Sequence, residues 1–296
     1  VWAGKVTHAQ RKHGVTQVEN GFLRSRGLVA DLTAPLSLVL DELGIYYDLS
    51  RTSRLEVLIA ASVHLEGAAI ERAEHLLEAI IFNNLSKYNL SRSVPDQVPK
   101  GRCILVPGQV EDDASIRLGA SDVNTNKALL ETTRTANPTA IIIYKPHPDV
   151  EAGLRDGHIA NATAFADVVA TNTDPIRLLD KVDEVWTMTS LLGFEALLRS
   201  KTVTCLGTPF YAGWGLTHDR AVPVARRIAR PSLAQLVHAV LIDYPRYHDP
   251  KTNLPCPVEV IVNRLATGDI PRPGPFNRTT AKLQGFFASC AYLWRN

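Results

Sequence analysis

Two short stretches of this chain hold carboxylates that could take part in catalysis. Glu19 comes shortly before Arg24 and Arg26, and guanidinium groups suit carboxylates and phosphates. The glutamate could act as a general acid or base, although a surface ion pair on a turn would have the same spacing. The second stretch runs from Gln109 to Ser115 and holds three consecutive acidic residues.

The acids at positions 111–113 could bind a metal, act as a base or act as a nucleophile. The metal interpretation is weak, because no histidine or further acid lies nearby in the sequence. The structural alternative is an acidic helix cap made by Asp113 or Ser115, which the helix dipole would favour.

A histidine and a pair of hydroxyls provide two further candidate sites. Prolines on both sides of His147 hold it in extended backbone, and the preceding Lys145 could add an anion contact. Thr189 and Ser190 stand where a helix is expected to begin, so hydroxyls, backbone N–H groups and the helix dipole could bind one phosphate. An ordinary Thr/Ser helix cap is the alternative.

Residues on either side of these sites could complete a nucleotide-sugar pocket. Gly193 would allow close approach of a phosphate, and Glu195 could reach ribose hydroxyls. The stretch 207–215 sets Tyr211 and Trp214 among glycines, which suits stacking on sugars or bases or, alternatively, packing over the core. Neither a GxGxxG motif nor a Walker loop occurs.

The elements that position these residues follow a strand–helix alternation. Before residue 91 we expect a short strand over 15–19 and helical structure over 53–83, bent at Gly67. A polar, proline-containing linker is expected over 91–101. After it, strands are expected over 103–107, 140–144, 183–188 and 202–206, with helices over 124–135, 174–180, 191–199 and 232–242.

Continuous apolar strands between helices predict a parallel, doubly wound sheet. The carboxyl ends of such strands share one edge, which is where ligands bind. Four of the five candidate clusters follow successive strands of this one sheet, so we expect them to converge at that edge. The apolar spacing over 283–294 indicates a last helix that packs on the body or, alternatively, lies on a membrane surface.

Composition excludes several classes of protein. The 296 residues suggest two domains, and 45% apolar and 21% charged residues are typical of a globular protein. The net charge of +2 gives no support for a nucleic-acid partner. No apolar run reaches the length of a membrane span, no signal peptide opens the chain, and the four scattered cysteines indicate a reducing, cytoplasmic compartment.

Five motifs together resemble the bacterial capsule-polysaccharide β-Kdo transferases of the KpsC type. They are the stretches at 19–25, 109–116, 145–149, 189–197 and 209–217, and the resemblance runs from about residue 1 to about 250. Proteins of that family carry two tandem modules, and the sequences at 109–113 and 46–48 are more similar to the C-terminal module.

The resemblance implies an α/β, GT-B-like fold with two Rossmann-like halves and parallel sheets. Residues 1–98 would form the acceptor-side half, 99–250 the donor half, and 251–296 a tail with a helix packed back on the body. The donor would be CMP-β-Kdo and the acceptor a Kdo-terminated glycolipid. Transfer would retain the β configuration through a covalent aspartyl adduct, with no metal and no cofactor.

The resemblance also assigns roles to residues. Asp113 would be the nucleophile, with the adjacent Asp112 as the other possibility. Glu19 would be the acid/base and His147 would face the CMP phosphate. Ser190, with Thr189, would bind the phosphate, and Gln109 belongs to the same donor site. Two further assignments come from the chemistry of the residues: Glu195 could bind the ribose, and Lys145 and Arg24 could neutralise the sugar carboxylate.

The sequence is also compatible with two other functions. An epimerase on the same scaffold would turn over nucleotide sugars without an acceptor, and a silent glycolipid-binding module of the export machinery would bind CMP without turnover. The partners implied are the lipid acceptor, the sister module and the capsule export machinery, with the protein peripheral at the inner membrane. Composition and spacing alone support only an α/β protein with a nucleotide site.

Overall fold

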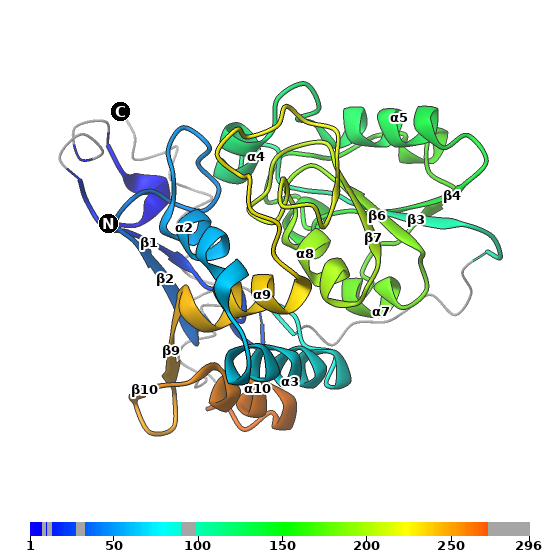
Figure 1. Ribbon diagram of the computed structural model, residues 1–296. Helices are drawn as coiled ribbons and strands as arrows, with labels where there is room; N and C mark the ends of the chain where they lie inside the picture. The colour runs from blue at the N-terminus through cyan, green and yellow to red at the C-terminus, as the bar shows by residue number, and fades with distance from the viewer. Residues whose placement is uncertain (8–9, 11–13, 28–32, 90–98, 272–296) are drawn as a thin grey trace, which may run out of the picture.

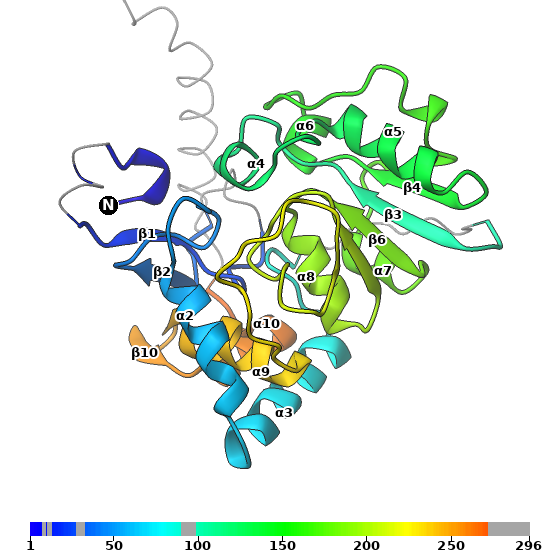
Figure 2. The same cartoon turned by 45° about the horizontal axis from the view of Figure 1, so that its top comes forward.

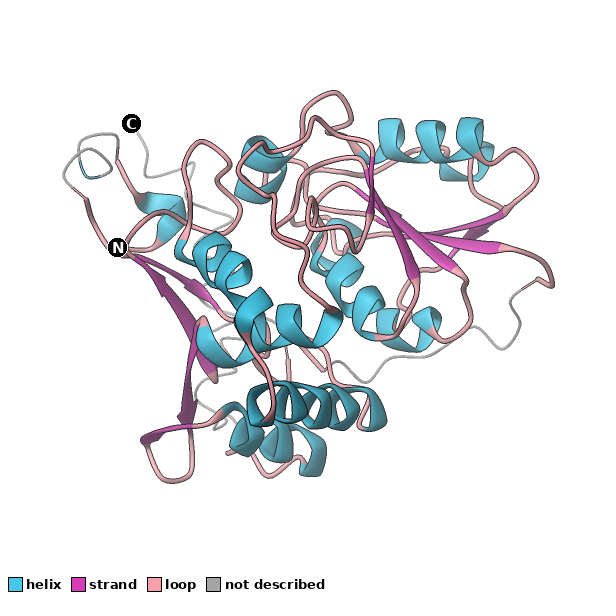
Figure 3. Cartoon of the chain, viewed as in Figure 1, coloured by secondary structure: helices cyan, strands magenta, loops and turns pink. Residues whose placement is uncertain are grey.

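The chain folds into two halves, each with its own sheet, and most helices lie between the sheets (Figure 1, Figure 3). This computed structural model describes residues 1–7, 10, 14–27, 33–89 and 99–271. No helix in these ranges is both long and apolar enough to cross a membrane.

The first half contains a four-stranded antiparallel sheet in the order β1-β2-β9-β10. Its strands are β1 (Gln17–Asn20), β2 (Ser37–Asp41), β9 (Pro245–Asp249) and β10 (Leu254–Cys256). The prediction of a parallel sheet in this half was therefore wrong. Nor does the chain divide at residue 250, because β9 and β10 complete a sheet begun near the N-terminus. In β9 a buried–exposed alternation carries Arg246 and His248 on the exposed face.

Helices from both ends of the chain cover this sheet. They are α2 (Arg54–Ala61), η3 (Ser62–His64), α3 (Ala68–Phe82), α9 (Leu233–Val237), the π-helix η5 (His238–Asp243) and α10 (Val258–Thr267), with the short η1 (Ala3–Lys5) near the N-terminus. Ser53 and Glu56 form a capping box that starts α2. Gly67, at positive φ, separates η3 from α3, as expected.

The second half contains a six-stranded parallel sheet in the order β5-β4-β3-β6-β7-β8. Its strands are β3 (Cys103–Pro107), β4 (Ile141–Lys145), β5 (Val168–Val169), β6 (Glu184–Thr187), β7 (Thr202–Cys205) and β8 (His218–Asp219). The predicted strands are confirmed, that at 103–107 with the same bounds.

Alternate residues of these strands face two different cores. Cys103 and Leu105 pack with α7 and α8, whereas Ile104 and Val106 pack with α4 and α5. Figure 2 shows the two helix layers on opposite faces of the sheet. The helices are α4 (Ala114–Gly119), α5 (Asn126–Ala136), α6 (Pro148–Glu151), η4 (Ala162–Ala164), α7 (Pro175–Leu179) and α8 (Leu191–Leu198). Because both of its faces are buried, the central strand β3 is apolar throughout. The doubly wound prediction for this half is confirmed.

Other predicted segments fall wholly or partly outside the described residues. Most of the expected linker at 91–101 and the whole of the expected tail helix at 283–294 lie there.

Strand order locates the ligand-binding edge of the second sheet. From β3 the order runs outward through β4 to β5 in one direction and through β6 to β8 in the other. The loops after β3 and β6 therefore diverge at the carboxyl edge, and open α/β sheets bind ligands at this switch point.

An aromatic cluster joins the two halves. Phe22 and Tyr46 of the first half lie 4.8 and 5.7 Å, between ring centroids, from Phe210 of the second. Phe194 of α8 lies 5.3 Å from the same ring, and Tyr244 completes the cluster next to Phe22. The apolar core is thus continuous from the first sheet to α8.

The chain crosses between the halves twice, and a buried carboxylate anchors the second crossing. Residues 220–232 lead from β8 back to α9, and Arg227 in this segment is buried. Its Nε donates to Glu56 of α2 at 2.7 Å, as does Nε of Arg226. Arg227 also donates to the carbonyls of Pro209 and Ala212, so α2, the crossing and the 209–212 loop form one unit.

Glu56→Ala is expected to lower the free energy of unfolding by about 3–5 kcal/mol, because it strands the buried Arg227 charge. Urea unfolding followed by circular dichroism measures this. Glu42→Ala is the control. Glu42 is exposed and lies 3.9 Å from Arg54, so its removal should change stability by no more than about 0.5 kcal/mol. Equal effects for the two variants would contradict the anchoring role of Glu56.

Candidate active site

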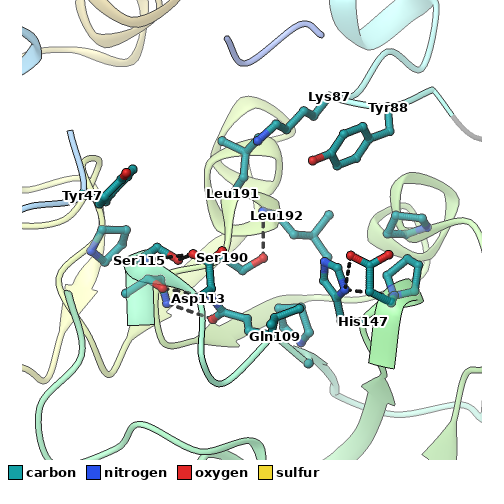
Figure 4. A pocket seen from close by; sticks show the side chains of 18 of the residues that line it. Tyr47, Lys87, Tyr88, Gln109, Asp113, Ser115, His147, Ser190, Leu191 and Leu192 are labelled. Atoms are coloured by element: carbon teal, nitrogen blue, oxygen red, sulfur yellow. Dashed lines mark hydrogen bonds and ion pairs between the residues drawn. The ribbon is translucent and has the colours of Figure 1, made fainter. Parts of the chain in front are cut away.

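A cavity of about 570 Å³ opens between the halves at the carboxyl edge of the parallel sheet. Figure 4 shows its central residues, with Asp113, Ser190 and His147 along one wall and Lys87 and Tyr88 across from them. The predicted residues that line it are Glu19, Gln109, Asp112, Asp113, Lys145, His147, Thr189, Ser190 and Glu195. Arg24 does not line it.

Gln109 ties together the two loops at the switch point. Its Nε2 donates to Thr189 Oγ1 at 2.9 Å, and its Oε1 accepts from the Thr189 backbone N–H at 2.9 Å. The same oxygen accepts from Thr187 Oγ1. The amide is thus occupied by scaffold contacts, and its observed role is to hold the loop after β6 against the loop after β3.

Asn126, which sequence analysis missed, fixes the other side of the loop after β3. It is fully buried, and its amide bonds to both the backbone N–H and the carbonyl of Gln109 at 2.8 Å. Its own N–H donates to Glu111 Oε1 at 2.7 Å. Of the three acids in this loop, Glu111 is therefore structural. The sequence signal that could have identified Asn126 is its position near the start of the helix expected over 124–135.

Asp112 and Asp113 have different surroundings. Asp112 accepts from Arg155 Nη2 at 2.7 Å, and its side chain is more than half exposed. Asp113 caps α4, accepting from both the N–H and the Oγ of Ser115 through one carboxylate oxygen. The capping alternative is thus present, and it leaves Oδ2 of Asp113 without a hydrogen bond from the described residues.

The charge of Asp113 reaches both walls of the cavity. Burial raises the pKa of the Tyr46 phenol well above its usual range, and the negative charges of Glu19 and Asp113 raise it further. Asp113 also acts on the pKa of His147. Tyr46, Glu19 and Asp113 therefore form one electrostatic group in the cavity.

The surroundings of His147 favour its neutral form. Its Nδ1 accepts from the backbone N–H of Asp149 at 3.1 Å and caps α6, so the proton of the neutral ring is on Nε2. Burial lowers its pKa, opposed in part by the negative charge of Asp149. The free ring nitrogen faces the interior of the cavity in Figure 4. In this form, the Nε2–H of His147 is a hydrogen-bond donor at the wall of the cavity.

Ser190 begins α8 at the centre of this wall. Its Oγ accepts from the Leu192 N–H at 3.2 Å, and its N–H donates to Thr187 Oγ1. Its carbonyl accepts from the Tyr211 hydroxyl. A Cβ on Gly193 would overlap that same hydroxyl, so Gly193 makes room for Tyr211 rather than for the phosphate expected there.

The aromatic loop after β7 is mostly core. Tyr211 and Trp214 are fully buried, and the Trp214 indole donates to the Phe210 carbonyl. Stacking of a ligand on these two rings is therefore excluded, and the packing alternative is correct. Phe210 alone of the three lines the cavity.

Glu19 is oriented by a short relay. Its Oε1 accepts from the N–H of Asn20 at 2.8 Å and from Nδ2 of Asn20 at 3.1 Å. Oδ1 of the same asparagine accepts from Arg24 Nε at 2.9 Å. The remaining Arg24 donors bond to Ser25 Oγ and to the Thr33 carbonyl. Arg24 thus orients Glu19 through Asn20 and does not reach the cavity.

Lys145 is likewise tied to its own surroundings. The side chain is buried, and Nζ donates to the Pro146 carbonyl at 2.6 Å and to Glu151 Oε2 at 3.4 Å. Its positive charge contributes to the field along the wall, where it helps lower the pKa of His147.

Glu195 is buried in α8 and joins the two halves. Its Oε1 accepts from the backbone N–H of Lys87 at 2.9 Å. Burial raises the pKa of this carboxyl to about 7, although the Lys87 hydrogen bond and the charge of Arg199 act in the opposite direction. Lys87 and Tyr88, which line the cavity, were not among the predicted site residues.

The described part of the chain holds no group of three or more His, Cys, Asp or Glu side chains that could bind a metal ion.

A family model described as "Capsule polysaccharide biosynthesis protein" matches residues 3–98 and 92–247. The chain belongs to this family. Among curated proteins, the capsule polysaccharide modification protein LipA of Neisseria meningitidis serogroup A is 47% identical over 252 residues, 84% of this chain and 36% of LipA. The lipopolysaccharide-processing protein LpsZ of Rhizobium meliloti is 48% identical over 78% of this chain and 54% of LpsZ. The chain thus spans about a third to a half of these relatives.

Two solved structures of KpsC from Thermosulfurimonas dismutans share the fold. The beta Kdo 2,4 transferase has a TM-score of 0.80 and 34% identity, covering 90% of this chain and 86% of that one. The beta Kdo 2,7 transferase has a TM-score of 0.72 and 37% identity, covering 86% and 78%. The predicted resemblance to KpsC-type proteins and the α/β, GT-B-like fold are confirmed, apart from the antiparallel first sheet.

Glu195→Gln is expected to change how stability depends on pH. In the wild type the folded state holds the Glu195 proton up to about pH 7, whereas the unfolded chain releases it near pH 4.5. Stability should therefore fall as pH rises between these values, by up to about 3 kcal/mol relative to the glutamine variant. Urea unfolding of both proteins at pH 5, 6 and 7 measures the difference. A constant difference between them would contradict the raised pKa.

Proposed function

We propose that this chain is a retaining β-Kdo transferase of capsular polysaccharide synthesis, with CMP-β-Kdo as donor and a Kdo-terminated glycolipid as acceptor. The observation that carries the proposal is the 34–37% identity and shared fold with two KpsC Kdo transferases. The cavity supports it, because Asp113, His147 and Ser190 of one half meet Glu19 of the other there.

The donor phosphate is assigned to the wall made by His147 and the start of α8. Nε2–H of His147 can donate to a phosphate oxygen, and Ser190 Oγ can add a second hydrogen bond. The positive end of the α8 dipole favours the same anion. A neutral donor at His147 suits a leaving group that departs as a phosphate monoester, because it stabilises the developing charge without having to lose a proton.

In the first step, Asp113 attacks the anomeric carbon of Kdo. A carboxylate oxygen forms a bond to this carbon while the bond to the CMP phosphate oxygen breaks and CMP leaves. The oxygen assigned to the attack is Oδ2, since Oδ1 is bonded to Ser115. Asp112 is the less suitable nucleophile because Arg155 already holds its Oδ1.

In the second step, Glu19 takes the proton of the acceptor hydroxyl as that oxygen attacks the same carbon. The ester bond to Asp113 breaks and the aspartate carboxylate is restored. Two inversions give net retention. The relay through Asn20 and Arg24 holds Glu19 in one orientation for this transfer.

The acceptor places the protein at a membrane in this proposal. A lipid-linked sugar would bring it to the cytoplasmic face of the inner membrane as a peripheral protein, beside the sister module and the export machinery. Product linkage analysis distinguishes transfer to position 4 from transfer to position 7 of the acceptor Kdo.

Asp113→Asn is expected to lower the transfer rate by about 10³-fold or more, because the amide cannot form the covalent adduct. Asp112→Asn is the matched control, with a loss of less than about tenfold. The assay combines CMP-Kdo generated in situ with a synthetic β-Kdo acceptor and reads products by mass spectrometry. Accumulated adduct in a slow variant such as Glu19→Gln would support the two-step mechanism.

The opposite ranking of the two asparagine variants would reassign the nucleophile to Asp112. Absence of transfer by the wild type, with CMP still bound, would replace the proposal by a binding module or by a module that needs its partner.

Chelation of divalent ions by EDTA is expected to leave the transfer rate within about twofold, because His147, Ser190 and the α8 terminus already supply the stabilisation of the leaving phosphate. Parallel assays with EDTA and with added Mg²⁺ test this. Loss of transfer in EDTA that Mg²⁺ restores would overturn the metal-independent mechanism.

A further inference from the structure

The cavity has a second recognition element on the first-half wall, formed by Lys87 and Tyr88. The Lys87 Nζ lies 5.4 Å from the centroid of the Tyr88 ring, and both residues line the cavity. In Figure 4 they lie across the cavity from Asp113, Ser190 and His147. An aromatic ring can cover the apolar face of a sugar, and a cation beside the ring can bind the carboxylate of an acidic sugar.

The backbone that carries these side chains is firmly held. The Lys87 N–H donates to Glu195, and the Lys87 carbonyl accepts from the N–H groups of Arg24 and Ser25 at 3.1 Å. The Tyr88 carbonyl accepts from Gly27 N–H at 2.8 Å. Contacts from both halves thus fix the loop, so its side chains are presented at a defined place in the cavity.

The Lys87 ammonium forms no side-chain ion pair among the described residues, although its charge helps to lower the pKa of the Glu195 carboxyl. The two cations that sequence analysis assigned to a sugar carboxylate are both engaged elsewhere, Lys145 with Pro146 and Glu151 and Arg24 with Asn20. Two further cations line the cavity: Arg155 is paired with Asp112, and Arg117 belongs to α4 in the second half. Lys87 is therefore available to an incoming anion on the wall opposite the assigned donor phosphate.

We propose that Lys87, together with the Tyr88 ring, binds the carboxylate of the acceptor sugar and so selects an acidic acceptor. This inference rests on the proposed transferase function. The donor is assigned to the second-half wall, where Asp113 attacks it. The acceptor must approach the other face of the adduct near Glu19, which lies on the same side of the cleft as the 86–88 loop.

Lys87→Met tests the assignment. The acceptors are a synthetic β-Kdo glycoside and the same glycoside with its carboxylate converted to a carboxamide. In the variant, the acceptor KM for the carboxylate form should rise about 10- to 100-fold, as expected for loss of one charge-assisted hydrogen bond, while the donor KM stays within about twofold. The wild type should prefer the carboxylate over the carboxamide by a similar factor, and Lys87→Met should have lost this preference.

Two further variants serve as controls. Lys87→Arg keeps the charge and should retain the preference for the carboxylate. Lys127→Met removes an exposed lysine of α5 that pairs with Glu131, and it should behave as the wild type. Thermal unfolding of each variant confirms that the comparison is between folded proteins.

An unchanged acceptor KM in Lys87→Met, or a change confined to the donor KM, would overturn the assignment and leave the transferase function standing. If the wild type transfers nothing, the proposed function fails, and saturation-transfer NMR then tests the subsite separately. Binding of the β-Kdo glycoside to the wild type but not to Lys87→Met would support the subsite. Equal binding to both, or binding to neither, would overturn it.

Discussion

The cleft depends on how the chain is held where it passes between its two halves. A buried glutamate contacts the chain at each of these two passages. Glu56 of the first half binds Arg226 and Arg227 in the second passage, and Glu195 of α8 binds the N–H of Lys87 where the first passage begins. Buried carboxylates are costly unless they are paired or protonated. Glu56 is paired with two guanidinium groups, and Glu195 has a pKa raised to about 7. The aromatic contacts of Phe210 with Phe22 and Tyr46 fill the space between these two anchors.

Inside the cleft, polar side chains divide into those that build the walls and those that face the ligand. Gln109 and Lys145 on the walls, and Arg24 behind them, have the chemistry of ligand-binding residues, but their donors and acceptors are satisfied by neighbouring protein groups. A polar cavity needs such residues, because each buried polar group beside it must have a partner. The side chains left to face the ligand are then few, and Asp113 and His147 each use only one of their two polar atoms in capping a helix.

The sequence predicted the second half well and the first half poorly. Strands such as 103–107 are buried on both faces and read as continuous apolar runs, so their bounds and their shared edge followed directly. In the first sheet, β2 and β9 are short and lie more than 200 residues apart in the chain, and β9 carries charged residues on its exposed face. Nothing local indicates that pairing. At the site, residue types predicted which loops converge, but not which polar atoms are already occupied. That distinction comes from tertiary hydrogen bonds such as Asn126 with Gln109 and Arg24 with Asn20.

The return of the chain to its first sheet has a consequence for making hybrids within this family. Since α9, β9, β10 and α10 come after the parallel sheet and yet pack with β1, β2 and α3, the parallel-sheet half is an insertion within a host domain rather than the second of two consecutive domains. A graft that joins the N-terminal part of one homologue to the C-terminal part of another would give the host a mismatched sheet. Exchange of the inserted half alone, with junctions in the two passages and the partners of Glu56 and Glu195 retained, would keep each sheet whole. It would also transfer the cavity wall that carries Asp113, His147 and Ser190 as a unit.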